Sequence, residues 1–333
     1  MARKPEGDKR RRILDAALKT FAERGFHGTS VPEVAEAAGV GTGTLYRYFA
    51  HKDALVNEVY RDAKLRLRAA LLESNNRAAT VLQQKLGSRP VLKLAANVGL
   101  EGLPDVPSLS LGTGLVSPLD MTAAFATFPN GGLSVRPHGI LRVTDADGIT
   151  VFEDTGKGER VISPETAFQM VSMLEDVVDR GTGNAVRQWG IRSPIGGKTG
   201  TTNDFKDAWF VGFSSSLVVG VWVGFDQPQK IGADAYGSKY ALPIWSDFMR
   251  QAARSKPGGE FAVPATLHDE QLCRVSYLRP VEGCPTYTEY FKDGDGIPTQ
   301  LCPIHSGSFK QELEREVRGV LGAIGRGIKG IFR

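Results

Sequence analysis

The sequence predicts a multidomain chain, in which an all-α helix-turn-helix domain is followed by an α+β domain. Its 333 residues suit about two domains of ordinary size. Up to about residue 66, apolar residues recur at the spacing of helices that bury one face. Beyond residue 117, helix starts alternate with short strand patterns, which is typical of an α+β domain.

The composition excludes several classes of protein. With 41% hydrophobic and 23% charged residues, a wholly disordered chain is disfavoured. The longest apolar stretch, residues 214–225, is shorter than the about 20 residues that a membrane span needs. The start, MARKPEGDKRRR, has no apolar segment behind it, so no secretory signal is expected. A cytoplasmic protein without a transmembrane span is therefore predicted.

The net charge of +4 is concentrated at one end of the chain. Residues 1–73 contain 14 basic and 10 acidic side chains, and the remainder is neutral overall. Residues 1–12 alone contain six basic and two acidic side chains. A basic arm before a small helical domain suggests contacts with phosphates. A solvated, disordered start is the alternative interpretation.

Two helices are predicted at the start of the chain. The first is capped by Asp8 and ends at Gly25, and the second begins with a capping box of Ser30 and Glu33 and ends at Gly39. Apolar residues of the first fall on one face: Ile13, Leu14, Ala17, Leu18, Phe21 and Ala22. Those of the second are Val31, Val34, Ala35 and Ala38.

A tight turn and a third short helix complete this segment. Val40 is expected to plug the turn, and Leu45 and Phe49 face the core four residues apart. The side chains left for the outside are Thr42, Thr44, Tyr46, Arg47 and Tyr48. Two short helices joined by a glycine turn form a helix-turn-helix, whose second helix enters the major groove of double-stranded DNA. Hydroxyl and guanidinium groups suit phosphates and base edges.

The segment ILDAALKTFAERGFHGTSVPEVAEAAGVGTGTLYRYFAHKDALV, within residues 8–66, resembles the DNA-binding domain of the Tet-repressor (TetR) family. The resemblance implies phosphate contacts at Thr44, Tyr46 and Lys52, and base contacts at Pro32, Thr42, Gly43 and Tyr48. In that family a long helical ligand-binding and dimerisation domain follows. The present sequence departs from that pattern by about Leu67, so whether the chain forms a homodimer stays open.

The later elements follow from caps and turns. Helices are predicted to begin at Ser117 and at Ser163, because each serine precedes proline. A hairpin is predicted from residues 140–143 and 149–152, around a Asp-Ala-Asp-Gly turn. Three consecutive strands are predicted at residues 197–202, 208–213 and 217–225.

Two short motifs in this part suggest acyl-transfer chemistry. Ser74-Asn75-Asn76 is S-x-N, and Lys198-Thr199-Gly200-Thr201 is K-T-G-T. Both accompany S-x-x-K in serine β-lactamases and penicillin-binding proteins. The S-x-N hydroxyl can relay a proton, and the K-T-G strand offers a cation, hydroxyls and backbone N–H groups to a carboxylate and an oxyanion. A helix cap at Ser74 and an ordinary strand edge at Lys198 are the structural alternatives.

The segments SNNRAATVLQQKLG, PSLSLGTGLVSPLDMTAAFATFPNGG and GGKTGTTNDFKDAWFVGFS resemble the transpeptidase domain of class A, bifunctional penicillin-binding proteins, over about residues 67–305. The resemblance implies a peptidoglycan stem peptide ending in D-alanyl-D-alanine as substrate, β-lactams as its mimics, and no cofactor. It implies a proton relay at Ser74, acyl-chain positioning at Asn76, and carboxylate binding at Lys198, Thr199, Gly200 and Thr201. The fold expected is a truncated penicillin-binding/β-lactamase-like transpeptidase domain.

The nucleophile of that family is missing from the sequence. No lysine has a serine three residues before it, so there is no S-x-x-K motif. Loss of a nucleophile alone removes on the order of 10⁶ in rate, so transpeptidation is expected to be lost. The first strands of the sheet, the glycosyltransferase domain and the membrane anchor are also expected to be absent. An open sheet edge and a poorly stable C-terminal half are predicted.

One continuous helix is predicted across the junction, with an apolar stripe at Val56, Val59, Tyr60, Ala63, Leu67 and Leu71. The predicted boundaries are 1–66 for the helix-turn-helix domain, 67–260 for the truncated transpeptidase domain, 261–308 for a cysteine-containing extension and 309–333 for a tail. The tail is either a basic amphipathic helix that contacts a membrane surface or a disordered segment.

Cys273, Cys284, Cys302 and His305 give the spacing C-x10-C-x17-C-x2-H. Zinc is one interpretation, but the long gaps favour one disulfide with a spare thiol, or three reduced thiols, and no metal is predicted. Three hypotheses for the whole chain follow: a DNA-binding protein, a penicillin-binding protein that cross-links peptidoglycan, and an inert product of rearrangement. The first is favoured.

Overall fold

The computed structural model describes residues 6–305 apart from 155, 157 and 294. The chain divides into two compact units, Met1–Pro264 and Ala265–Arg333. The tail predicted at 309–333 and the first five residues of the basic arm lie outside the described residues. Within that described part, no helix has the length and apolar character needed to cross a membrane.

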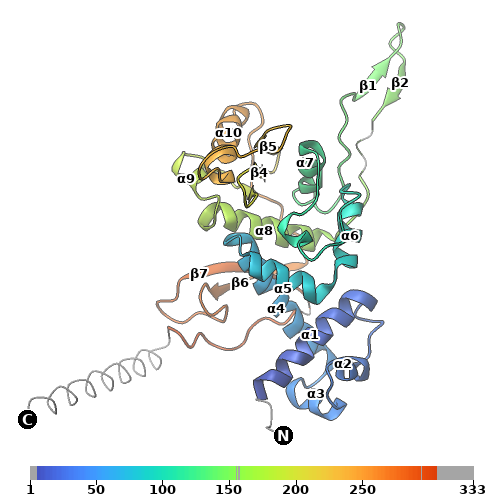
Figure 1. The fold of residues 1–333 in the computed structure, drawn as a ribbon, viewed down its shortest axis with the longest axis vertical. Helices are drawn as coiled ribbons and strands as arrows, with labels where there is room; N and C mark the ends of the chain where they lie inside the picture. Colours follow the sequence, from blue (N-terminus) through green and yellow to red (C-terminus); the bar gives the residue numbers. More distant parts are fainter. Residues whose placement is uncertain (1–5, 155, 157, 294, 306–333) are drawn as a thin grey trace, which may run out of the picture. The chain divides into compact units, whose positions relative to one another are not determined.

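The first unit begins with four helices, shown in dark to mid blue in Figure 1. They are α1 (Glu6–Arg24), α2 (Val31–Ala37), α3 (Thr42–Tyr48) and α4 (Lys52–Leu72). The predicted cap at Asp8 is wrong, because α1 already includes Glu6 and Asp8 lies inside it. Gly25 ends the helix with a φ of +75°, in the left-handed region that favours glycine. The Ser30–Glu33 capping box is present in both directions.

These helices enclose a core of their own. Its buried members are Ile13, Leu14, Ala17, Val31, Val34, Ala35, Ala38, Leu45, Phe49, Leu55 and Val59. Val40 packs against this core from the turn, as the sequence predicts. Complete burial of an aliphatic side chain stabilises a fold by about 1.5–3 kcal/mol, so this core is substantial for four short elements.

The junction predicted to be one helix is α4, which runs without a break from Lys52 to Leu72. α5 (Asn76–Leu86) follows, packs against both α1 and α4, and places Lys85 in an ion pair with Asp15 of α1. α4 also packs against α8 (Pro164–Arg180), where Arg68 forms a buried ion pair with Asp176. The helical segment and the following domain are therefore packed together within one unit.

A second group of elements leads to the sheet. α6 (Ser88–Asn97) and the short 3₁₀ helix η1 (Leu109–Leu111) precede α7 (Pro118–Ala126), which Ser117 caps as predicted. The predicted hairpin is formed by β1 (Arg142–Thr144) and β2 (Thr150–Glu153), and every residue of both strands is exposed. In Figure 1 this green hairpin extends away from the neighbouring helices.

The three predicted strands form one antiparallel sheet in the order β3–β4–β5. They are β3 (Gly196–Thr201), β4 (Asp207–Phe213) and β5 (Val218–Gly224). α10 (Gly237–Ala252) covers one face, where Phe210 stacks edge-on against Trp245 at 5.0 Å between ring centres. On the other face Phe213 packs with Leu174 of α8. The short α9 (Ala185–Gln188) lies between α8 and the sheet in sequence.

Both outer strands of this sheet are incompletely covered within the described residues. β3 is hydrogen-bonded to β4 alone, and every residue of β5 is half-buried. Three apolar side chains on one face of α10 are also exposed: Tyr240, Ile244 and Phe248. The described sheet thus has unpaired outer strands, as the sequence predicts, whereas the truncation of the domain stays a prediction.

The second unit contains one hairpin of β6 (Leu267–Cys273) and β7 (Thr286–Lys292). The strands are antiparallel, with Cys273 opposite Thr286 and Leu267 opposite Lys292. Their inner face holds a small core of Leu272, Tyr287 and Phe291. A parallel bridge between Arg279 and Leu301 brings the later chain alongside the loop after β6.

Candidate functional site

The helix-turn-helix exposes the side chains of α3 that face away from its core. Leu45 is fully buried, whereas the neighbouring Tyr46 is 48% exposed. Gly43 is exposed and has open space where a Cβ would lie, so a ligand can approach the backbone there. Pro32, in the first turn of α2, is exposed as well. The remaining predicted DNA contacts on α3 are half-buried: Thr42, Thr44 and Tyr48.

Cationic groups border this surface in two different ways. Arg47 is exposed, and its guanidinium carbon lies 5.4 Å from the centre of the Tyr48 ring. Lys52 is half-buried, and its Nζ donates a hydrogen bond to the Phe26 carbonyl at 2.7 Å. The same Nζ lies 4.2 Å from the centre of the Phe26 ring, within the range of a cation–π contact. Lys52 therefore has a structural role in addition to its predicted one.

The S-x-N and K-T-G-T motifs meet in space, although 124 positions separate Ser74 from Lys198. Lys198 Nζ donates a hydrogen bond to Ser74 Oγ and another, of 2.9 Å, to the Thr199 carbonyl. Ser74 has a φ of +49°, a left-handed conformation that non-glycine residues seldom adopt outside turns and functional sites. Asn75, and not Ser74, caps α5 by accepting from the Ala78 N–H at 3.0 Å. The helix-cap interpretation of Ser74 is therefore wrong.

The charge state of Lys198 is sensitive to its surroundings. Burial disfavours the ammonium form and lowers the pKa of Lys198 to about 8. A lysine that titrates near neutral pH can take up and release a proton, which is what a relay between two hydroxyls requires. The Ser74–Lys198 pair is thus suited to proton exchange with a third hydroxyl group.

Two further contacts complete the K-T-G-T strand. Thr199 Oγ1 lies 2.9 Å from Thr182 Oγ1, which follows α8. Thr201 Oγ1 accepts a hydrogen bond from the Gly237 N–H, at 2.9 Å, at the start of α10. A Cβ on Gly237 would lie 2.3 Å from the Trp209 carbonyl oxygen, so only glycine permits this approach. Sequence reasoning missed Thr182 and Gly237, because nothing local to either residue points to the motif strand.

Asn76 and Gly200 occupy different positions around this cluster. Asn76 is exposed in the first turn of α5, two residues after Ser74. Gly200 lies within β3, opposite Trp209 of β4. The structure thus brings Ser74 of the first motif into contact with Lys198 of the second, and the 333 residues contain no S-x-x-K that could add a nucleophile.

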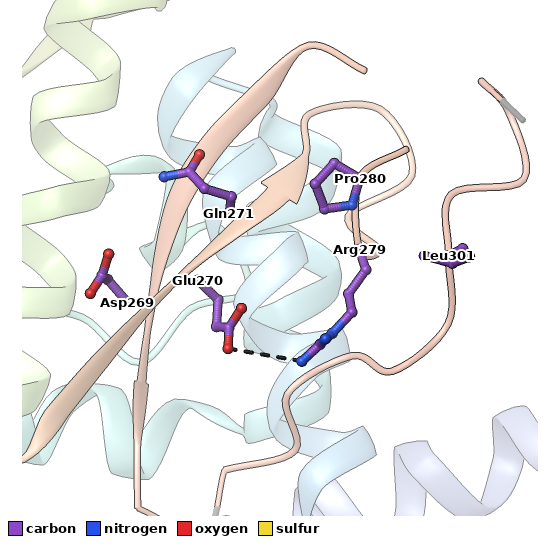
Figure 2. Close-up of a pocket in the computed structure, with 6 residues that line it drawn as sticks. All are labelled: Asp269, Glu270, Gln271, Arg279, Pro280 and Leu301. Atoms are coloured by element: carbon purple, nitrogen blue, oxygen red, sulfur yellow. Dashed lines mark ion pairs between the residues drawn. The ribbon is translucent and has the colours of Figure 1, made fainter. Parts of the chain in front are cut away.

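The second unit has a surface pocket, shown in Figure 2, that contains none of these motif residues. It is lined by Asp269, Glu270, Gln271, Arg279, Pro280 and Leu301. Arg279 and Glu270 form an ion pair at 3.9 Å across it, and both side chains are substantially exposed. No serine or lysine lines this pocket, so it is not the site of the predicted chemistry.

The same unit brings the four C-terminal sulfur and imidazole groups together. The ligand atoms of Cys273, Cys284, Cys302 and His305 all lie within 4.8 Å of one another. All three cysteines are free thiols, so the predicted alternative of one disulfide is not formed here. Their spacing allowed this convergence as the less favoured of the interpretations, because the gaps between the cysteines are long.

Two family models match the chain, and they overlap in α4. Residues 13–59 match bacterial regulatory proteins of the tetR family. Residues 48–250 match the penicillin binding protein transpeptidase domain, and this match covers more than half of the chain. The overlap, residues 48–59, runs from the last residue of α3 into the first part of the continuous helix α4.

Curated relatives point to the same domain. The chain is 44% identical over 199 residues to penicillin-binding protein 1A of Aquifex aeolicus, covering 60% of this chain and 27% of that protein. It is 33% identical over 296 residues to penicillin-binding protein 1A of Pseudomonas aeruginosa, covering 73% of this chain and 36% of that protein. The chain thus spans about a quarter to a third of the length of these relatives.

A solved structure agrees with these sequence matches. The crystal structure of penicillin-binding protein 1A from Haemophilus influenzae superposes with a TM-score of 0.63 and 29% identity, over 71% of this chain and 41% of that one. The expected fold, a helical N-terminal region followed by an α+β transpeptidase domain, is confirmed. The chain therefore belongs to the penicillin-binding protein transpeptidase family and has a tetR-like helix-turn-helix domain near its N-terminus, whose last residues overlap the transpeptidase match.

Proposed function

We propose that this chain binds double-stranded DNA through its helix-turn-helix and has lost transpeptidation. The observation that supports DNA binding is the exposed Tyr46 on α3, which lies above the buried core of the first four helices. Arg47 and Gly43 lie on the same short helix. Helix-turn-helix domains place such a helix in the major groove, with phosphate contacts from hydroxyls and cations. The proposed phosphate contacts are Thr44, Tyr46 and Lys52, and the proposed base contacts are Pro32, Thr42, Gly43 and Tyr48.

The loss of transpeptidation is argued from the missing hydroxyl. Acyl transfer needs a serine with a lysine base, and the sequence has no S-x-x-K. We assign Ser74 the proton-relay role that the S-x-N resemblance implies, in contact with Lys198, and not the role of the missing serine. We therefore propose Ser74, Asn76 and Lys198 as remnants of the catalytic machinery, and Lys198, Thr199, Gly200 and Thr201 as a remnant of the substrate cradle.

The domain boundaries and the compartment belong to the same proposal. We assign residues 1–66 to the DNA-binding domain, 67–260 to the truncated transpeptidase domain, 261–308 to the extension and 309–333 to the tail. A DNA-binding chain acts in the cytoplasm, whereas enzymes that cross-link peptidoglycan act outside the membrane. The position of the chain in the cell therefore distinguishes the two functions.

DNA binding is tested by titrating a fluorescent duplex of mixed sequence with the full chain at several salt concentrations. The logarithm of the affinity is expected to fall linearly with the logarithm of the salt concentration, because phosphate contacts release counterions. Tyr46→Ala is expected to weaken binding about tenfold, the size of one hydrogen bond to a charged group. Tyr240→Ala, which removes an exposed tyrosine from α10, is the matched control and should leave binding unchanged.

Two results would contradict this function. One is an affinity that does not depend on salt, and the other is an equal effect of Tyr46→Ala and Tyr240→Ala. Circular dichroism of both variants shows whether the helices remain folded, so that loss of folding is not mistaken for loss of a contact.

The runner-up function is binding of a stem peptide or a β-lactam, supported by the assembled contacts among Ser74, Lys198, Thr199 and Thr182. A fluorescent penicillin followed by denaturing electrophoresis tests for a covalent adduct. No labelled band is expected; a stoichiometric band would overturn the proposed loss of activity. Reversible binding, measured by calorimetry with the same penicillin, would support a binding remnant. Absence of both DNA and penicillin binding would favour an inert rearrangement product.

A further inference from the structure

We propose that Cys273, Cys284, Cys302 and His305 form a structural zinc site in the second unit. The four ligand atoms converge on one point, although the residues are spread over 33 positions of the sequence from 273 to 305. Cys273 and Cys302 are fully buried, and Cys284 and His305 are half-buried. The site is independent of the proposed function, because it shares no residue with either motif cluster.

The separations between the ligand atoms suit a tetrahedral ion. His305 Nδ1 lies 3.5 Å from Cys273 Sγ, 3.3 Å from Cys284 Sγ and 3.2 Å from Cys302 Sγ. The sulfurs of Cys302 and Cys273 are 3.6 Å apart. Tetrahedral zinc with Zn–S bonds of about 2.3 Å and Zn–N bonds of about 2.1 Å spaces its ligands by roughly 3.5–3.8 Å. These four separations lie close to that range, and the remaining sulfur pairs lie within 4.8 Å.

The backbone places each ligand by a different element. Cys273 is the last residue of β6, and Cys284 lies two residues before β7, so the hairpin register brings them together. The Cys302 N–H donates to the Arg279 carbonyl at 2.8 Å, next to the parallel bridge between Arg279 and Leu301. These backbone bonds hold the chain in position whether or not a metal is bound, so the site is prepared in advance.

Backbone N–H groups also point at two of the sulfurs. The Val275 N–H donates to Cys273 Sγ at 3.4 Å, and the Val281 N–H donates to Cys284 Sγ at 3.3 Å. Hydrogen bonds of this kind favour the thiolate form and orient the ligand, as outer groups do in metal sites. A thiol that only filled space in an apolar core would not need such donors.

The donor set selects the metal and its role. Three thiolates and one imidazole form a soft set that prefers zinc over magnesium or calcium. All four tetrahedral positions are occupied by protein groups, so no position is left for water or substrate. The site therefore stabilises the fold and has no catalytic role.

The second unit also needs such a stabilising element. The unit is shorter than about 70–80 residues. Below that length one hydrophobic core seldom supplies enough stability, and natural domains add a metal or disulfides. Within the described residues, its hydrophobic cluster is small and has Leu272, Tyr287 and Phe291 as its buried members. A disulfide between Cys273 and Cys302 would join two ligands and leave Cys284 and His305 without a reason to converge.

The test uses the full chain, purified with reductant and supplied with zinc chloride, then desalted and measured by atomic spectrometry. One zinc per chain is expected, and Co²⁺ in its place should give the visible absorption of a tetrahedral thiolate complex. Cys302→Ser and His305→Ala are expected to weaken zinc binding more than the about 10–100-fold typical of an outer-group change. His268→Asn is the matched control, since His268 pairs with Asp293 on the same unit and is not a ligand.

Measurements on the wild-type chain distinguish a zinc site from a disulfide and from separate thiols, so the test does not depend on whether the variants fold. Intact mass of the wild-type chain distinguishes three thiols from a disulfide, which has two hydrogens fewer. A disulfide that persists in reductant, less than stoichiometric zinc on the wild-type chain, or octahedral Co²⁺ spectra would each overturn the proposal. Zinc retained by Cys302→Ser and His305→Ala at wild-type affinity would overturn it as well.

Discussion

Tyr60 Oη donates a hydrogen bond of 2.9 Å to Oε1 of the buried Gln169, which joins α4 to α8. Tyr60 immediately follows the residues that match the tetR family, and Gln169 lies within the transpeptidase match. Eight residues further along α4, Arg68 forms its ion pair with Asp176 on the same helix α8. All four residues lie within the transpeptidase match, so these contacts fix α4 against α8 inside that segment, whereas the ion pair between Lys85 and Asp15 joins the segment to α1 of the tetR match.

The Arg68–Asp176 pair is expected to be essential for stability. Arg68 is only 2% exposed, so Asp176→Ala would deprive a buried guanidinium of its carboxylate. Breaking a buried pair by removing one partner costs about 3–5 kcal/mol in the free energy of unfolding. Urea unfolding followed by tryptophan fluorescence measures this loss. Asp247→Ala breaks an exposed pair with Arg250 and should change stability by less than about 1 kcal/mol; equal effects would refute the argument.

Glu175 is expected to make the stability of the first unit fall as pH rises. Burial, reinforced by the nearby carboxylates of Asp179, Glu260 and Asp176, raises its pKa from 4.5 to about 8. Between these two values the folded chain binds more protons than the unfolded chain, so rising pH favours unfolding. Glu175→Gln should abolish that part of the pH dependence. Urea midpoints measured from pH 4.5 to 8 provide the test, and an unchanged slope in the variant would refute it.

Lys198 is expected to act in the opposite direction at higher pH. Its pKa falls from 10.5 to about 8 on burial, so the folded chain binds fewer protons than the unfolded chain between these values. Stability should therefore rise with pH across that window, and Lys198→Met should flatten the rise. The exposed Lys256→Met is the control and should keep the wild-type slope. A slope that survives in Lys198→Met would show that another group is responsible.

Lys52 is expected to contribute to both folding and DNA binding. Its Nζ has three N–H donors, and the bond to the Phe26 carbonyl uses one of them. Lys52→Met should lower stability by about 1–2 kcal/mol and reduce the salt slope of duplex binding by about 1. Thermal unfolding and anisotropy at several salt concentrations measure the two effects. An unchanged salt slope with reduced stability would assign Lys52 a purely structural role.

Local signals in the sequence predicted most of the described elements. The caps at Ser30, Ser117 and Ser163 fix helix starts through hydrogen bonds within three residues, so they can be identified without tertiary information. Asp8 failed as a cap because acidic residues are also common within the first turns of helices, and α1 includes the residues before it.

The parts that could not be predicted depend on contacts between distant residues. Thr182 reaches Thr199 only because α8 packs against β3. Likewise, the cysteine cluster depends on the register of β6 with β7 and on the bridge between Arg279 and Leu301. The spacing of residues along the sequence does not determine either arrangement. For the cysteines, a disulfide or separate thiols was therefore the favoured prediction.

The continuous helix α4 has a consequence for how this chain can be divided. Residues 48–59 match both family models, and the same stretch supplies Leu55 and Val59 to the core beneath α3. A cut on either side of this stretch would remove buried side chains from one part or leave the other with an exposed helix face. The two family segments are thus not separable modules: a protease or a shortened gene cannot release one of them intact without taking along a turn of the other.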